Sequence, residues 1–398
     1  MPSTRTRRRF LTACGAASVG VVAGCLGSDA GHDAAAGAAG DRTDWPTAGH
    51  DAANTNYALG APAIRGLSEV NRVDDRFGSA QPVVADGTLF LVGDTLRTVD
   101  VDSGEQGWAI EPEDGQGNFW AAPTVRDGTV YLANGHRRVH AVDAESGQKR
   151  WTADVDVGSY VSPRLDEDGE ALYVGGEGHV SRLDAETGEG EWTRDLFGQV
   201  RQPLAVRRGV VYAVTEGGEL YALDEYGDGY WRVDLPAKCQ TPPTSVGRQV
   251  FVGTFDGFVH AVDTTRANLA WSTEVGGFAK GGIAVADGTV YADGGRKLHA
   301  LDADTGERRW AFDVGTTGDH TPVVAGDTVL TTGDRLYGLN PDGGLSNGAI
   351  RREALRFSYP TGGYAGPTSV ADNRVYVTAR LGDEEGNQTT AVLMLEPS

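Results

Sequence analysis

Ala141-Val-Asp143-Ala-Glu-Ser-Gly147-Gln-Lys-Arg-Trp151 decides the fold, because the chain repeats this spacing of Asp, Gly and Trp. Residues 300–310 read Ala-Leu-Asp-Ala-Asp-Thr-Gly-Glu-Arg-Arg-Trp, with the same spacing. Further copies lie at 98–108, at 182–192, at 222–231, which is one residue shorter, and at 261–271, where Ala267 takes the place of Gly. A period of about forty residues made of short strands is typical of a β-propeller, with one four-stranded blade per repeat.

Each part of the repeat has a structural role. A strand pattern such as Asp127-Gly-Thr-Val-Tyr-Leu132 precedes each copy, and its β-branched and aromatic residues suit a buried strand. The segment Asp-x-x-Ser/Thr-Gly is typical of a tight hairpin, because Asp caps the turn and Gly supplies a positive φ. The large ring at the end of the repeat can fill the wedge between two blades. We therefore expect six docking tryptophans: Trp108, Trp151, Trp192, Trp231, Trp271 and Trp310.

The number of repeats predicts eight antiparallel blades. A step into the first strand of a blade occurs at Pro82, Pro123, Pro163, Pro203, Pro243, Gly282, Pro322 and Pro367. The seventh repeat lacks the docking turn and carries an insertion through Ala349, with its outer strand expected at 354–359. The eighth repeat has no Trp strand, whereas residues 67–77 resemble an outer strand without a blade. Since an unpaired edge invites aggregation, we expect this N-terminal strand to close blade eight. The alternative is seven blades and an irregular C-terminal extension.

This spacing resembles the tryptophan-docking motif of the PQQ-like, or quinoprotein-type, propeller repeat. The resemblance covers residue 44 to the C-terminus. It includes Trp45-Pro46 and Asn54-Thr-Asn-Tyr57, which resemble the first segment of this family, where it packs over the closure of the ring. The resemblance implies the propeller fold, but the same repeat builds both enzymes and non-enzymatic scaffolds.

The N-terminus is typical of an export signal. Thr6-Arg-Arg-Arg-Phe-Leu11 is a twin-arginine pattern, and the apolar stretch that follows is too short to span a bilayer. It ends in Val22-Ala-Gly-Cys25, which resembles a lipobox, so we expect a signal peptide over 1–25 and a lipid on Cys25. The alternative is an ordinary cleaved signal. Residues 26–43 are rich in Gly, Ala, Asp and Ser and are expected to form a flexible linker to a propeller at 44–398. The protein would then lie on the outer face of the cytoplasmic membrane.

The composition is strongly acidic. The 398 residues carry 56 Asp and Glu against 35 Lys and Arg, a net charge of −21. A surface of this kind suits high salt and indicates a halophilic source. Nucleic acid is excluded as a partner, because no basic stripe is present to neutralise phosphates. The alternative, an acidic face for a cationic ligand, is less favoured because the charge recurs in every repeat.

The mouth of the central channel is the candidate binding site, because propellers bind ligands where the loops before the first strands converge. In this chain these loops are richer in aromatic and cationic residues than the remainder: Trp120, Tyr160, Arg201, Gln202, Lys280, His320 and Tyr364. Such residues could hold a planar anionic ligand by stacking and charge. The alternative is structural: Trp120 and Tyr160 would plug the channel, and Arg201 would pair with a neighbouring carboxylate.

Two classes of function follow. The first is a non-catalytic, monomeric scaffold that binds a protein or peptide, similar to the lipid-anchored outer-membrane assembly lipoproteins of bacteria. The second is a quinoprotein dehydrogenase that uses PQQ and calcium, or a PQQ-binding protein. The adjacent Cys-Cys pair of many such dehydrogenases is missing, and no Glu, Asn and Asp set matches their calcium ligands. We therefore expect no catalytic residues and no resident cofactor.

No metal site is expected. His140, His260 and His299 share one repeat position and would lie in different blades, too far apart to bind one ion. The Asp-rich hairpins lack the bidentate Glu of a calcium loop. Apart from Cys14 in the signal segment and Cys25, the chain has only Cys239, which leaves no disulfide framework unless Cys25 reaches it.

Overall fold

The computed structural model describes residues 43–74, 80–112, 119–134, 137–156, 161–277, 281–315, 321–347, 350–382 and 388–398. These residues are all-β, and none of them belongs to a helix that could cross a bilayer. The expected signal segment with Cys25 and most of the expected linker lie outside the described residues, as do Tyr160, Lys280 and His320.

Blade two shows how one repeat folds. Its four antiparallel strands lie in chain order: β7 (Thr124–Arg126), β8 (Thr129–Ala133), β9 (Arg138–Asp143) and β10 (Lys149–Asp154). Every residue of β8 is buried, as its Val, Tyr and Leu content indicates. In the hairpin between β9 and β10 the backbone N–H of Ser146 donates to Asp143 Oδ1 at 2.9 Å, and Gly147 has a φ of 70°. The hairpin therefore forms for the reason that the sequence indicates.

Five further blades repeat this pattern with consecutive strands. Blade one is β3 (Val83–Ala85), β4 (Thr88–Val92), β5 (Leu96–Asp100) and β6 (Gln106–Ile110). Blade three is β11 (Arg164–Leu165), β12 (Ala171–Gly175), β13 (His179–Asp184) and β14 (Gly190–Asp195). Blade four is β15 (Ala205–Arg207), β16 (Val210–Val214), β17 (Glu219–Leu223) and β18 (Gly229–Asp234). Blade five is β19 (Thr244–Val246), β20 (Gln249–Gly253), β21 (Phe258–Asp263) and β22 (Asn268–Glu274). Blade six is β23 (Ile283–Ala286), β24 (Thr289–Gly294), β25 (Lys297–Asp302) and β26 (Arg308–Asp313).

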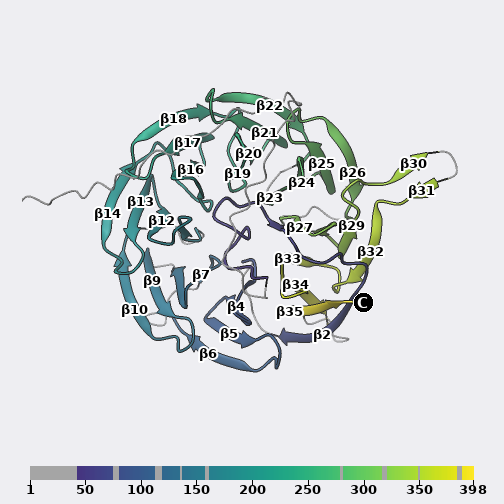
Figure 1. The fold of residues 1–398 in the computed structure, drawn as a ribbon, viewed down its shortest axis with the longest axis horizontal. Coiled ribbons are helices and arrows are strands. Elements are labelled where there is room, and N and C mark those ends of the chain that lie inside the picture. The colour runs from purple at the N-terminus through teal and green to yellow at the C-terminus, as the bar shows by residue number, and fades with distance from the viewer. Residues whose placement is uncertain are drawn as a thin grey trace, which may run out of the picture. The chain divides into compact units, whose positions relative to one another are not determined.

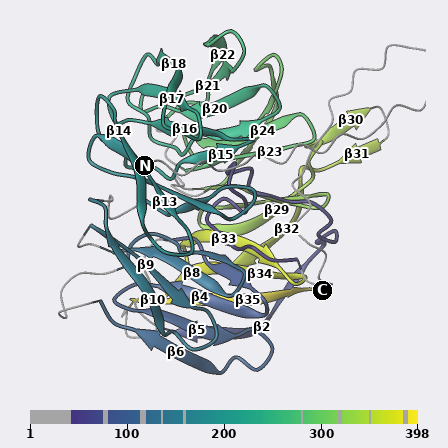
Figure 2. The same ribbon diagram turned by 60° about the vertical axis from the view of Figure 1, so that its left-hand side comes forward.

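Blade seven contains the insertion. Its strands are β27 (Val323–Ala325), β28 (Thr328–Thr332), β29 (Arg335–Leu339) and β32 (Leu355–Pro360), and the short β1 (Tyr57–Ala58) pairs parallel with β27. The insertion forms a separate hairpin of β30 (Leu345–Asn347) and β31 (Ile350–Arg352). Figures 1 and 2 show this hairpin projecting from the rim of the propeller.

Blade eight joins the two ends of the described chain. Its sheet order is β2-β35-β34-β33, with β33 (Ala365–Ala371), β34 (Arg374–Gly382), β35 (Gln388–Pro397) and β2 (Leu67–Asp74). β2 pairs antiparallel with β35, from Leu67 opposite Pro397 to Asp74 opposite Ala391. The prediction of eight blades, the last closed by an N-terminal strand, is confirmed (Figure 1).

The strand directions give the propeller two different faces. We call the turn face the side that carries the connections from first to second strand and from third to fourth strand, such as 127–128 and 144–148 in blade two. The loop face carries the connections from second to third strand and those between consecutive blades, such as residues 196–204. The expected channel mouth belongs to the loop face.

The docking tryptophans lie between consecutive blades. Each packs at a tilt against an aromatic ring of its own blade, as Trp151 does against Tyr131 with centroids 6.0 Å apart. A Cβ added to Gly188, in the turn of blade three, would lie 2.5 Å from the Trp151 ring, so only Gly allows this approach. Five of the indole Nε1–H groups donate to a carbonyl of the next blade at 2.8–3.1 Å: those of Trp108, Trp151, Trp192, Trp271 and Trp310.

The segment Thr43–Ala58 crosses the centre of the ring beside the first strands of the blades (Figure 1, purple). Its carbonyl groups accept backbone hydrogen bonds of 2.7–3.0 Å from six blades: Thr43 from Asp372, Pro46 from Val125, Ala52 from Val206, Ala53 from Ser245, Thr55 from Val285 and Asn56 from Val324. Trp45 forms an antiparallel bridge with Val84 of blade one. Only the start of this segment therefore lies at the closure, whereas the sequence predicts the whole of it there.

Arg164 connects the same segment to blade three. It is 1% exposed and donates to Thr47 Oγ1 at 2.6 Å, to Asn54 Oδ1 at 2.7 Å and to the carbonyl of Ala48 at 2.9 Å. Burial lowers its pKa to about 10, although attraction to Asp51 works in the opposite direction. Burial alone would raise the pKa of Asp51, but bonds to His50 and Thr55 hold it below its usual value. The segment thus contacts every blade as it crosses the channel.

Candidate functional site

The loop face holds the described residues of the expected binding site. Trp120, between blades one and two, is 38% exposed. Arg201, between blades three and four, contacts Glu216 at 3.0 Å and Gln199 Oε1 at 2.7 Å. Gln202 is half-buried. Tyr364 lies under the Arg380 guanidinium, 5.0 Å from the ring centroid. Arg201 has the carboxylate partner that the structural alternative expects.

Two aromatic residues on the loop face were missed by the sequence analysis. Phe197 is 75% exposed, and its backbone N–H donates to the Tyr221 hydroxyl at 3.2 Å. Phe255 is 46% exposed in the turn between the second and third strands of blade five. Phe197 lies in the connection that also supplies Arg201, so an inspection of the whole connection would have found it. Phe255 follows the second strand of its blade. The sequence analysis considered only the loops that precede first strands, which do not include this residue.

Carboxylates crowd the turn face. The connections on this face contain Asp86, Asp102, Asp127, Glu145, Glu167, Glu186, Glu225, Asp287, Asp304, Asp327 and Asp342. Carboxylates at the ends of third strands are held ionised by guanidinium partners. A hydrogen bond from Arg309 lowers the pKa of Asp302 to about 2, and bonds from Arg150 and Ser146 hold the pKa of Asp143 far below its usual value. The acidic charge recurs in every repeat, as expected.

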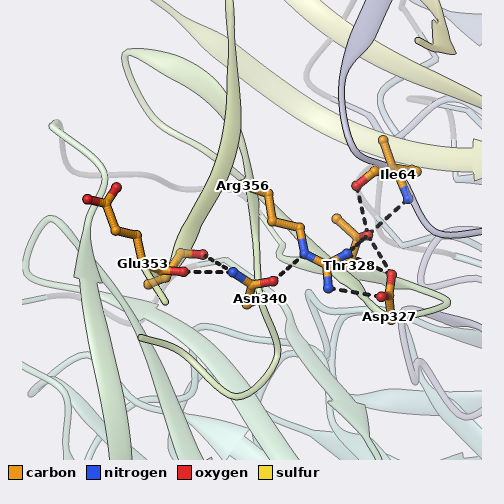
Figure 3. A network of polar contacts seen from close by, with 7 residues as sticks. Ile64, Asp327, Thr328, Asn340, Glu353 and Arg356 are labelled. Carbon is orange, nitrogen blue, oxygen red and sulfur yellow. Dashed lines mark hydrogen bonds and ion pairs between the residues drawn. The ribbon is translucent and has the colours of Figure 1, made fainter. Parts of the chain in front are cut away.

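A polar network on blade seven borders two hollows of the turn face (Figure 3). The Arg356 guanidinium donates to Asp327 Oδ1 at 2.7 Å, to Asp327 Oδ2 at 2.9 Å and to Thr328 Oγ1 at 2.9 Å. It also donates to Asn340 Oδ1, and Thr328 Oγ1 in turn accepts from the backbone N–H of Ile64 at 3.1 Å. Asp327 and Arg356 line both hollows: one of about 490 Å³ between blades six and seven, and one of about 260 Å³ beside Arg65.

The histidines and Cys239 have structural surroundings. His140 bonds Thr152 at 2.9 Å and His260 bonds Ser272 at 2.8 Å, each across the third and fourth strands of its blade. Burial raises the pKa of the Cys239 thiol to about 12, so this cysteine is poorly reactive. Among the described residues no group of three or more His, Cys, Asp or Glu could hold a metal ion.

The described residues do not fit PQQ with calcium on the channel axis. Thr43–Ala58 lies against the first strands there, and its polar groups are bonded to the blades, as Asn54 Nδ2 is to the carbonyls of Leu204 and Pro243 at 2.9 Å. A calcium ion needs six to eight oxygen ligands, and the described residues offer no carboxylate set for them. We therefore derive no reaction step through this cofactor.

Comparison with known proteins places the chain in a family. A family model described as "Outer membrane protein assembly factor BamB" matches residues 31–177, 176–278 and 256–347. The outer membrane protein assembly factor BamB of Nitrosomonas eutropha is 31% identical over 110 residues, which are 26% of this chain and 26% of the relative. BamB of Yersinia pestis is 28% identical over 143 residues, 31% of this chain and 36% of the relative.

A third relative belongs to a different class of protein. The serine/threonine-protein kinase AfsK of Streptomyces coelicolor is 34% identical over 119 residues, which are 28% of this chain and 14% of the kinase. The matched stretches thus span between 14% and 36% of these three relatives.

Solved structures with low sequence identity share the fold. The quinohemoprotein alcohol dehydrogenase of Comamonas testosteroni superposes with a TM-score of 0.71 at 15% identity, over 89% of this chain and 80% of the enzyme. BamB of Moraxella catarrhalis superposes with a TM-score of 0.64 at 17% identity, over 83% of this chain and 98% of that protein. With the repeats and the eight blades, the family match shows that this chain belongs to the BamB-like family of PQQ-like β-propellers.

Proposed function

We propose that this protein is an exported, lipid-anchored and non-catalytic propeller that presents its loop face to a protein or peptide partner. Its membership of the BamB-like family supports a binding or scaffold role. A relative described as an assembly factor acts with other proteins, which favours a protein as the partner. The lipid on Cys25, the monomeric state and the location on the outer face of the cytoplasmic membrane belong to the same proposal.

The position of Thr43 carries the proposal. Its carbonyl accepts from the N–H of Asp372, and Asp44 Oδ1 accepts from the N–H of Asp86 at 3.3 Å. Asp372 and Asp86 both lie in turns between first and second strands, so the chain joins the propeller at the turn face. A tether that leads to Cys25 would start from this side. The loop face, with Trp120 and Phe197, would then point away from the membrane.

The chemistry of the loop face suits a protein partner. Phe197 is an exposed aromatic ring in the same connection as Arg201, which pairs with Glu216. Exposed aromatic residues are typical of interface anchors, since they supply much of the binding energy. No described residue set on this face resembles a catalytic arrangement, so a surface for binding is the better interpretation. Tyr160, Lys280 and His320 are assigned to the same expected surface only by their positions in the sequence, before the first strands of blades three, six and seven.

Site-specific photocrosslinking in the native cell tests the partner face. A photoreactive phenylalanine analogue replaces Phe197 on the loop face or, as the matched control, Tyr226 on the turn face; the two side chains are 75% and 72% exposed. We expect a protein adduct from position 197 and none from position 226. Adducts from position 226 alone, or from neither position, would refute the proposed face.

The lipid anchor is tested separately. In a Cys25→Ala variant the protein should move from the membrane fraction to the medium, and the mass shift of the acyl chains should be lost. A variant that stays in the membrane fraction would contradict the anchor while leaving the partner face open to its own test.

A quinohemoprotein alcohol dehydrogenase shares this fold, so PQQ binding by this protein is tested directly. Tryptophan fluorescence of the purified propeller is followed while PQQ is added, with and without calcium. A flat titration is expected. Saturable, calcium-dependent quenching at micromolar PQQ would overturn the non-catalytic proposal and call for alcohol and sugar oxidation assays.

A further inference from the structure

The larger hollow on the turn face lies between blades six and seven and has a volume of about 490 Å³. Apolar groups such as Ala286, Trp310 and Val324 line it together with Gly326. Its charged lining residues are Asp287, Asp327, Asp342, Arg309 and Arg356. A volume in this range is enough for one side chain or a small ligand.

Comparison with blades two and four shows what can occupy the equivalent groove between blades. Arg126, the last residue of the first strand in blade two, donates from Nη1 to the carbonyl of Asp166 in blade three at 3.2 Å. Arg207, at the same position in blade four, donates to the carbonyl of Gly247 in blade five at 2.7 Å. In blade six the same position holds Ala286. Two grooves between blades are thus bridged by an arginine of this chain, and the hollow is a groove of the same kind with a methyl group in its place.

The acceptor of the bridging arginine is retained. Gly326 follows the first strand of blade seven just as Gly247 follows that of blade five, and it lines the hollow. The carbonyl group at this position accepts from an arginine in blade five, so its counterpart in blade seven can do the same.

The charges around the bridging arginine are also retained. Arg126 contacts Asp127 at 3.4 Å in blade two, and Asp287 follows Ala286 in the same way. Arg150 donates to Asp143 at 2.7 Å and to Thr129, and its counterpart Arg309 donates to Asp302 at 2.8 Å and to Thr289. The surroundings in which this chain holds Arg126 therefore recur around Ala286.

The lining of the hollow has three carboxylates and two guanidinium groups, which favours a cation over an anion. Its two guanidinium groups are already bonded to carboxylates, Arg309 to Asp302 and Arg356 to Asp327. The rim adds Asp287, which accepts from the Tyr57 hydroxyl at 3.4 Å, and Asp342. An anion would meet carboxylates whose cationic partners are engaged, whereas a guanidinium would meet carboxylates and a carbonyl, the acceptors that its five donors require.

We propose that the hollow between blades six and seven binds an arginine side chain of a partner protein or peptide. The side chain takes the place that Arg126 and Arg207 occupy in their grooves, next to Ala286, with its guanidinium at the level of the Gly326 carbonyl. This site is separate from the loop face and does not depend on the function proposed for that face.

Ligand-observed saturation-transfer NMR with the purified propeller tests the proposal, since it detects weak binding to a protein of this size. The probe is the peptide acetyl-Gly-Arg-Gly-amide, and its citrulline analogue is the neutral isostere. We expect saturation transfer to the arginine methylene groups and about tenfold weaker binding of the citrulline peptide, because a charge-assisted hydrogen bond is lost. Equal affinity for the two peptides would overturn the assignment.

Three variants locate the site. Ala286→Arg places the chain's own guanidinium in the hollow and should abolish binding. Val246→Arg adds the same charge at the same repeat position of blade five and should leave binding unchanged. Asp287→Asn, on the rim, should weaken binding several-fold. This variant tests the location of the site if Ala286→Arg does not fold. Unchanged affinity in Ala286→Arg, or in Asp287→Asn in that case, would refute the site.

Discussion

Asn71 of β2 faces Gly104 of blade one: a Cβ added to that glycine would lie 1.7 Å from Asn71 Nδ2. The register places Asn71 opposite Met394, as Trp231 is placed opposite Ala222, each beside a bulge. Asn71 therefore occupies the docking position of blade eight, and the N-terminal strand supplies both the missing edge and the residue that contacts the next blade. Phe357, opposite Gly338, has the docking position of blade seven.

Replacing a docking tryptophan should weaken the contact between two blades. Trp151→Ala removes a half-buried ring that packs against Tyr131 and donates to the carbonyl of Ala185 at 3.1 Å. We expect a loss of about 3 kcal/mol in the free energy of unfolding, the low end for an emptied aromatic site. Denaturant melts measure it, with Asn71→Ala as the comparison that should cost less. A loss below about 1 kcal/mol for Trp151→Ala would refute the docking role.

The junction between blades four and five should be improved by one substitution. Ala267 has a φ of 53° where the other docking turns have Gly, and it packs near Trp231. A positive φ strains an L-residue, although Gly also loses more entropy on folding. We expect Ala267→Gly to stabilise the protein by up to about 1 kcal/mol. Thermal melts check it against Gly188→Ala, which introduces a positive-φ Ala in blade three together with a Cβ 2.5 Å from the Trp151 ring, and which should destabilise.

Stability should decrease as the pH falls below neutrality, in part because of His299. Burial, together with Arg308 and Lys297, lowers the pKa of His299 from its usual 6.5 to about 4. The unfolded chain therefore binds a proton between pH 6.5 and 4 that the folded chain does not, so folding stability is lost as the pH falls through this window. In a His299→Gln variant the slope of unfolding free energy against pH should be smaller there. An unchanged slope would show that His299 is not a source of the loss.

Asp293 should have the opposite effect. It is buried between blades six and seven with Thr331 Oγ1 at 3.3 Å, and burial raises its pKa well above the usual value. The folded chain then holds a proton that the unfolded chain releases above about pH 4, so this residue lowers stability as the pH rises toward its folded pKa. Asp293→Asn keeps the hydrogen bond without the charge.

This variant should be more stable than the wild type at pH 7 by about 1–2 kcal/mol, with a smaller difference at pH 4. Urea melts at the two pH values measure both differences. A variant that is less stable than the wild type at pH 7 would contradict the burial of an uncompensated carboxyl.

The parts of the fold that were predicted depend on side chains with a fixed spacing. The docking turns, the strand patterns and the unpaired strand at 67–77 each carry such a signal, and the blades follow from them. The path of Thr43–Ala58 was only partly predicted, because its bonds to the blades come from backbone carbonyl groups that any residue can offer. One side-chain signal was available: Arg164 is a charged residue at a first-strand position where other blades have Val, Thr, Ser or Ala.

The candidate sites were less predictable. Sequence placed Trp120, Arg201 and Tyr364 on one face. Their partners cannot be read from spacing, because Glu216 lies in the connection between β16 and β17 and Arg380 lies in β34. The hollow beside Ala286 lies at a repeat position that holds arginine in blades two and four, and alanine also in blades one, seven and eight. A search for reactive or charged residues does not detect a site of this kind, whereas an alignment of the repeats against one another does.

The segment Thr43–Ala58 is synthesised before any blade, yet the groups it bonds to are complete only after residue 372 has been made. β2 can pair even later, because its partner β35 ends at Pro397 and is synthesised last. The first described residues are therefore among the last to be ordered, and until then the edge of β35 is open to pairing with other chains. Such long-range contacts slow folding, so we expect the ring to close in one late step that orders the channel and blade eight together.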